Sequence, residues 1–188
     1  MDSSKLISVG RTTAKVSFFG GALIFLLFYL SNSGEFGLLG VLYAACMFII
    51  NLVIVALIVF KANREKTSRK HLFRTVGVML LNIPIFIFYC WFAIILMNTV
   101  RVTFVNSTTD DLVNIKINGC QGRNIDKLKV GQSKTLWIHI PNDCGISIAY
   151  KLKGNIVSED ITGYVSSDGG YIMTFYIGTH QKPYDHDL

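Results

Sequence analysis

Two long stretches without a charged residue constrain the fold more than any other feature of this sequence. They run from Phe36 to Phe60 and from Thr75 to Thr99. At about 1.5 Å per residue, a helix of either length extends roughly 37 Å, more than the bilayer's hydrocarbon core of about 30 Å. Both stretches are therefore predicted to form transmembrane helices with a modest tilt.

A shorter apolar stretch, Val16 to Leu30, is predicted to form a further transmembrane helix. Basic residues precede it, as they also do in cleaved signal peptides, which are the alternative. The short connection from Ser31 to Glu35 suits a turn between antiparallel helices and favours a retained helix. We therefore expect a cytoplasmic N-terminal segment over residues 1–15 and three transmembrane helices within residues 16–99.

The basic residues predict the orientation of these helices. Six lysines and arginines crowd into residues 61–74, whereas the first connection carries only Glu35. Because cytoplasmic loops of membrane proteins are enriched in Lys and Arg, loop 61–74 and the N-terminus are predicted to be cytoplasmic. Everything after Thr99 is then extracytoplasmic. We favour a bacterial inner membrane, in which case this part faces the periplasm, and we expect no nucleic-acid partner despite the net charge of +6.

From Val100 onward, apolar residues alternate with polar ones, which is typical of half-buried strands. Gly154-Asn155 and Asp168-Gly169-Gly170 have the composition of hairpin turns. Residues 100–179 are therefore predicted to form a small antiparallel β-sandwich of the immunoglobulin-like type, with an open barrel as the alternative. Residues 180–188 are expected to be a flexible tail. The alternation covers residues 100–104, 113–117, 136–140, 146–152 and 171–177.

Two of the four cysteines fall in this β region, at Cys120 and Cys144. A domain this small buries limited apolar surface, and a disulfide closing a loop of this size contributes about 3 kcal/mol in the chain-entropy model. We predict that the two residues are oxidised. Two free buried thiols are the alternative, favoured if the domain is cytoplasmic.

Few polar residues interrupt the transmembrane stretches. Asn51 and Asn82 lie at similar distances from the cytoplasmic ends of neighbouring antiparallel helices, so a helix-helix hydrogen bond between them is predicted. Pro84 is expected to kink the third helix. The stretches contain no Asp, Glu, Lys, Arg or His, which argues against a transporter or pump.

Exposed aromatic side chains are candidates for a partner surface. Trp137 and His139 alternate with apolar residues along one strand and are therefore expected on its outer face, and Tyr164 is expected to be similarly placed on another strand. Such residues often contribute to protein interfaces. A second sheet or the membrane interface could instead cover them.

The sequence lacks a phosphate-binding glycine loop, a CxxC pair and an HExxH motif. We therefore expect no catalytic residues, no metal and no cofactor. The leading hypothesis is a non-enzymatic integral membrane interaction protein, an accessory subunit of a membrane complex whose partners are membrane lipids and a protein. The alternatives are an immunity protein against an envelope-acting toxin and a ligand-sensing membrane effector.

Overall fold

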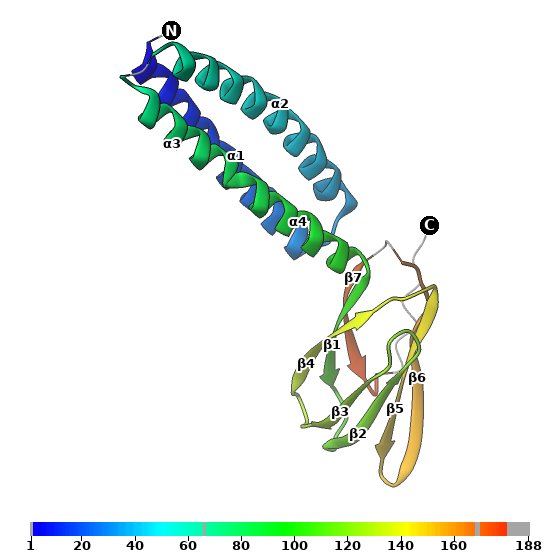
Figure 1. The fold of residues 1–188 in the computed structure, drawn as a ribbon. Coiled ribbons are helices and arrows are strands. Elements are labelled where there is room, and N and C mark those ends of the chain that lie inside the picture. Colours follow the sequence, from blue (N-terminus) through cyan, green and yellow to red (C-terminus); the bar gives the residue numbers. More distant parts are fainter. Residues whose placement is uncertain (1, 66, 168–169, 180–188) are drawn as a thin grey trace. The chain divides into compact units, whose positions relative to one another are not determined.

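The computed structural model describes residues 2–65, 67–167 and 170–179. The chain divides into two compact units, a helical unit (Met1–Ala93) and a β-unit (Ile94–Leu188). Figure 1 shows the helices of the first unit and the strands of the second. The hairpin turn predicted at residues 168–170 lies mostly outside the described residues, and the tail predicted at residues 180–188 lies wholly outside them.

In the part of the chain that the structure describes, three helices are long and apolar enough to cross a membrane, as the sequence predicted. They are α1 (Ser3–Ser31), α2 (Gly34–Arg64) and a third, Arg69–Met97, composed of α3 (Arg69–Leu80) and α4 (Asn82–Met97). The break at Leu81 lies three residues before Pro84, which cannot donate a backbone hydrogen bond and crowds the carbonyl one turn earlier. The third helix is therefore interrupted close to Pro84, the residue at which the sequence predicted a kink.

The first helix begins earlier than predicted. Residues 3–15, expected as a separate segment before the apolar stretch, form the first half of α1. They are helical because they pack, with Leu6 and Ala14 buried in a cluster that includes Ile58 of α2 and Leu72 of α3. Most polar residues of this segment are exposed, as in an amphipathic helix, with Ser3 buried and Thr13 half-buried as the exceptions.

Helices α1 and α2 approach closely at small residues. The Tyr43 hydroxyl of α2 donates to the carbonyl of Val16 at 2.6 Å, and it passes over Gly20, where an added Cβ would lie 2.1 Å from the tyrosine oxygen. Further along, Gly37 and Gly40 of α2 face Phe28 and Ile24 of α1. Glycine therefore permits the close helix contact, as in other membrane helix pairs.

Substituting Gly20 tests this contact. Gly20→Ala is expected to lower the free energy of unfolding by about 1–3 kcal/mol, because the new methyl group displaces the Tyr43 hydroxyl. Gly21→Ala is the matched control, since a Cβ there meets nothing within 4 Å and alanine favours the helix. Unfolding by sodium dodecyl sulfate in mixed micelles, followed by circular dichroism, measures both. Equal effects of the two substitutions would contradict the contact.

The described residues of the β-unit form seven strands in two sheets. One sheet has the order β4-β1-β7 and the other the order β3-β2-β5-β6. All pairs are antiparallel except β1 with β7, which run parallel, whereas antiparallel strands were expected throughout. The strands are β1 (Thr99–Asn106), β2 (Leu112–Asn118), β3 (Arg123–Leu128), β4 (Ser133–His139), β5 (Cys144–Leu152), β6 (Asn155–Val165) and β7 (Tyr171–Ile177).

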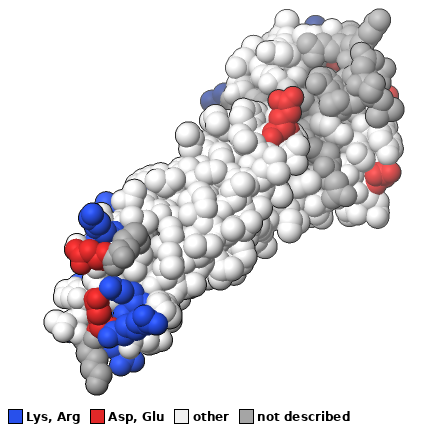
Figure 2. Space-filling view, turned by 90° about the horizontal axis from the view of Figure 1, so that it is seen from above, with Lys and Arg blue, Asp and Glu red and all other residues white. Residues whose placement is uncertain are grey.

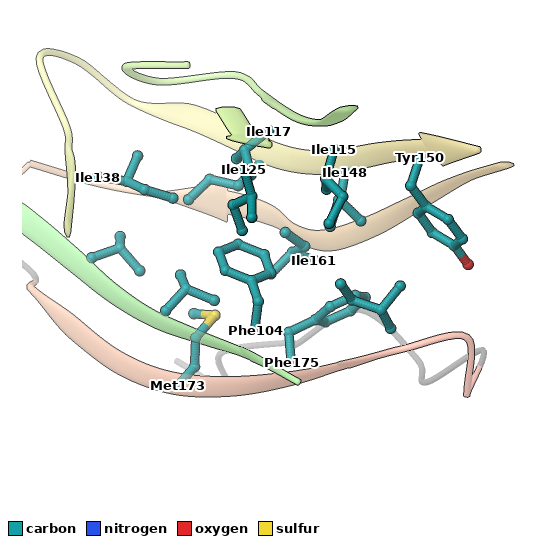
Figure 3. Close-up of a cluster of buried hydrophobic side chains, with 14 of the residues drawn as sticks. Phe104, Ile115, Ile117, Ile125, Ile138, Ile148, Tyr150, Ile161, Met173 and Phe175 are labelled. Atoms are coloured by element: carbon teal, nitrogen blue, oxygen red, sulfur yellow. The ribbon is translucent and has the colours of Figure 1, made fainter. Parts of the chain in front are cut away.

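A single cluster of buried apolar residues draws on both sheets. Figure 3 shows side chains of the two sheets pointing toward one another: Phe104, Met173 and Phe175 on one side, and Ile117, Ile125 and Ile148 on the other. Tyr150 is also buried and its hydroxyl donates to Glu159 Oε1, which accepts in addition from Gly178 N at 3.1 Å. Burial, and secondly the carboxylate, raise the pKa of the Tyr150 phenol.

Strand β2 departs from the predicted alternation. Val113, expected on the buried face with Ile115 and Ile117, is 41% exposed, and Leu112 is buried in its place. Asn114, between Val113 and Ile115, has a φ of 52°. This left-handed residue changes the side-chain alternation of β2, while the register of β2 with β3 stays continuous on both sides of it. The pattern after Asn114 therefore agrees with the prediction, and the pattern before it does not.

A disulfide joins Cys120 to Cys144, as predicted, with the Cα atoms 5.3 Å apart. It ties the end of the β2–β3 hairpin to the start of β5. The backbone is tightly packed here, since a Cβ on Gly119, whose φ is +86°, would lie 1.8 Å from the carbonyl oxygen of Gly145. The glycine therefore permits the close approach of the two segments that the disulfide links.

Candidate functional site

The side of the β4-β1-β7 sheet that faces away from the buried cluster is the candidate site. Val100, Val102 and Phe104 of β1 point into the cluster, so the residues between them point the other way. The strand register aligns these outward residues in three rows, which we call the sheet face: Trp137, Arg101 and Ile172; Thr135, Thr103 and Thr174; and Ser133, Val105 and Tyr176.

The sheet face is apolar and hydroxyl-rich. Arg101 is the only Lys, Arg, Asp or Glu residue in its three rows. Trp137, Ile172 and Tyr176 are 37%, 45% and 41% exposed. Surfaces that combine aromatic and aliphatic residues with few charges are typical of the centres of protein interfaces.

Trp137 is held in place by its neighbour across the strands. The guanidinium carbon of Arg101 lies 5.5 Å from the centre of the Trp137 ring, within the range of a cation–π contact. Arg101 is only 7% exposed, so the positive charge lies beneath the indole and not on the surface. In the middle row, the hydroxyls of Thr103 and Thr135 are hydrogen bonded at 2.8 Å.

His139, predicted on the same outer face as Trp137, lies at the junction between α4 and β1. Its Nδ1 donates to the carbonyl of Asn98 at 2.9 Å, and the backbone N–H of Ile140 donates to the same oxygen at 3.0 Å. Asn98 in turn donates its own backbone N–H to Ile94. The last turn of α4, which belongs to the β-unit, is thus linked by these hydrogen bonds to the end of β4, and Asn98 alone separates α4 from β1.

Tyr164, the remaining aromatic residue of the predicted surface, belongs to β6 of the other sheet. It is 61% exposed, and its hydroxyl donates to Asp143 Oδ2 at 2.7 Å, which raises the pKa of the phenol. The strand register therefore does not bring Tyr164 together with Trp137. Sequence reasoning also missed Ile172 and Tyr176, which only the parallel β1–β7 pairing places beside β1.

The predicted hydrogen bond between Asn51 and Asn82 is wrong for the described residues, because each amide is directed at α1. Asn51 Nδ2 donates to Ser17 Oγ at 2.8 Å and to the carbonyl of Met47 at 2.7 Å. Asn82 Nδ2 donates to the carbonyl of Ala14 at 3.0 Å. The similar depth of the two residues was insufficient, since rotation about each helix axis decides which neighbour a side chain meets. Both amides still join helices.

The two ends of the helical unit differ in chemistry. Figure 2 shows lysines and arginines gathered at one end of the helices and uncharged residues along their length. That end comprises the start of α1, the end of α2 and the start of α3. Toward the other ends of α1 and α4, aromatic rings stack: Phe25 lies 4.7 Å from Tyr89, and Tyr29 lies 6.3 Å from Phe92, between ring centres.

An open hollow of about 400 Å³ marks the other sheet of the β-unit. It forms where β2 and β5 separate, because these strands pair only from Lys116 to Asn118 of β2. Lys116, Asp126 and Lys151 contribute to its lining together with Ile156. These side chains are solvent-exposed, and no group of three or more His, Cys, Asp or Glu residues suited to a metal occurs among the described residues.

Comparisons with known proteins add little to this geometry. No family model and no curated protein matches the sequence. A solution NMR structure of a protein from Eubacterium rectale is similar over 42% of this chain and 79% of its own chain, with 12% sequence identity and a TM-score of 0.30.

Proposed function

We propose that the chain is a non-enzymatic integral membrane interaction protein, an accessory subunit whose three transmembrane helices anchor a β-unit that binds a protein partner. The proposal includes a β-sandwich of the immunoglobulin-like type for the β-unit. Two sheets that share one buried cluster support the sandwich, since facing sheets bury their side chains between them. We further place the protein in a bacterial inner membrane.

The exposed surface of the helices supports the membrane anchor. Large apolar side chains lie exposed along α2 and α4, including Phe48 at 67% and Ile87 at 60%. In water such a surface would be an aggregation site, whereas a bilayer solvates it. The basic residues at one end and the aromatic residues toward the other match the two interfaces of a membrane.

The observation that carries the function is the sheet face. A charge-poor surface built around Trp137, Ile172 and Tyr176 suits a partner that buries it, because aromatic anchors dominate binding energy at interfaces. With only Asn98 between α4 and β1, the chain has no linker on which the β-unit could extend far from the bilayer. The partner is therefore proposed to lie in or on the same membrane.

The orientation gives a direct test. We expect a membrane-impermeant maleimide to label Asn142→Cys, in the loop before β5, on intact spheroplasts, and to label Asn63→Cys, at the end of α2, only after permeabilisation. Both positions are exposed, and the free cysteines Cys46 and Cys90 are first replaced by alanine. The reverse labelling pattern would show that the β-unit is cytoplasmic.

Partner identification tests the function itself. Solubilisation in a mild detergent at native expression, followed by affinity purification and mass spectrometry, is expected to return the same protein partner in independent preparations. Recovery of the free chain in every preparation would contradict the proposal, provided that in-cell cross-linking before lysis gives the same result.

A further inference from the structure

At the basic end of the helical unit, close contacts fix the register of α1 against the third helix. An added Cβ on Gly10 of α1 would lie 2.7 Å from Thr75 Cγ2 of α3. One turn further along α1, and about two turns further along the third helix, Asn82 Nδ2 donates to the carbonyl of Ala14 at 3.0 Å. Both helices run away from the basic end, since α2 returns the chain to that end between them.

This register places Arg11 and Arg74 on the same side of the seam between the helices. Each residue of an α-helix is rotated by about 100° from the one before. Helices α1 and α3 run parallel and touch at Gly10 and Thr75. The residue that follows Gly10 and the residue that precedes Thr75 therefore point toward the same side of the two helices. Arg11 and Arg74 occupy these two positions, and both are exposed.

Two further cations extend this side of the seam. Lys15 follows Arg11 by one turn and Lys70 precedes Arg74 by one turn, and both are exposed. We call Arg11, Lys15, Lys70 and Arg74 the basic seam. The ion pairs found among the described residues involve none of them.

The acidic residues of this end are held elsewhere. Glu65 pairs with Lys61 at 2.6 Å and accepts a hydrogen bond from Ser3. Asp2 accepts from Ser4 Oγ at 2.6 Å. Among the described residues of this end, the acidic side chains are therefore paired with groups other than the basic seam.

We propose that the basic seam binds the phosphate of an anionic phospholipid headgroup, with the guanidinium groups of Arg11 and Arg74 as its main contacts. Arginine presents paired N–H donors that match phosphate oxygens. This inference rests on the proposed membrane anchor. It goes beyond orientation, because it assigns a lipid site to particular residues.

The apolar residues that follow Arg11 and Arg74 favour a lipid over free phosphate as the ligand. Phe18 follows Arg11 by seven residues and Val78 follows Arg74 by four, so both continue the same helix faces. They are 37% and 41% exposed. A headgroup held at the arginines can therefore lay its acyl chains against an apolar surface, which inorganic phosphate cannot use.

The test is lipid titration of the full-length protein in a neutral maltoside detergent, with bound lipid counted by native mass spectrometry. The probes are phosphatidylglycerol, phosphatidylcholine of the same chain length, and inorganic phosphate. Arg11→Gln/Arg74→Gln is compared with Arg64→Gln/Arg69→Gln. The control pair removes the same charge from the same end, but its guanidinium groups lie over Phe60 and Phe73.

We expect the wild-type chain to retain phosphatidylglycerol in preference to phosphatidylcholine. The seam variant should lose about ten- to a hundredfold in affinity for phosphatidylglycerol, and the control less than about threefold. Arg11→Lys/Arg74→Lys should restore part of the affinity if the seam variant is folded by circular dichroism. Equal losses in both variants, or displacement of the lipid by inorganic phosphate, would overturn the site while leaving partner binding by the sheet face untouched.

Discussion

Replacing Cys120 and Cys144 with alanine is expected to lower the free energy of unfolding of the β-unit by about 3 kcal/mol. The disulfide closes a loop with a sequence separation of 24 residues, and without it the unfolded chain regains the entropy of that loop. Urea unfolding in detergent, followed by Trp137 fluorescence in a Trp91→Phe background, measures the change.

The matched control for this prediction is the replacement of Cys46 and Cys90, which are free and exposed on α2 and α4. Their substitution should leave the unfolding of the β-unit unchanged. Reducing the wild-type protein with dithiothreitol should reproduce the effect of the paired substitution. A paired variant as stable as wild type would mean that the disulfide does not constrain the unfolded β-unit.

Phe104→Ala is expected to lower the stability of the β-unit by about 3–5 kcal/mol. Phe104 lies on the central strand of its sheet with no exposed surface, and its ring contacts that of Phe175 with 6.5 Å between centres. Truncation removes the aromatic contact and leaves a cavity between the sheets, because the neighbouring strands cannot collapse into it.

Val113→Ala is the control for Phe104→Ala, because the structure places Val113 on the exposed side of β2. Its expected cost is below about 0.5 kcal/mol, typical of surface substitutions. The same urea titration measures both variants. If Val113→Ala were as costly as Phe104→Ala, the side-chain shift at Asn114 would be wrong and the original alternation of β2 correct.

The transmembrane helices were predictable because the hydropathy of a segment indicates whether water or an apolar environment surrounds it. A long run of uncharged, apolar residues forms either a membrane helix or a buried helix in most cases. The start of α1 was not predictable in this way, because residues 3–15 are polar on average. They become helical because Leu6 and Ala14 pack into a buried cluster with the neighbouring helices. Asn51 and Asn82 show the same limit: depth follows from residue counting, while rotation about the helix axis depends on packing.

In the β-unit, alternation located the strands with regular burial and missed those without it. In β3, the buried residues Ile125 and Leu128 are three apart, so no period of two is visible. The sequence likewise could not predict which residues make up the sheet face. Trp137 of β4 and Ile172 of β7 share this face only because both strands pair with β1, one on each side. Local patterns cannot report a parallel pairing between distant strands.

Site-specific photo-cross-linking in cells tests the central claim most directly. Benzoyl-phenylalanine is placed at Trp137 in the full-length protein at native expression, and at Ile156, a 74% exposed residue of the other sheet, as the control. The account predicts one reproducible cross-linked membrane protein from position 137 and none from position 156. Cross-links to the same protein from both positions, or from neither, would contradict binding through the sheet face.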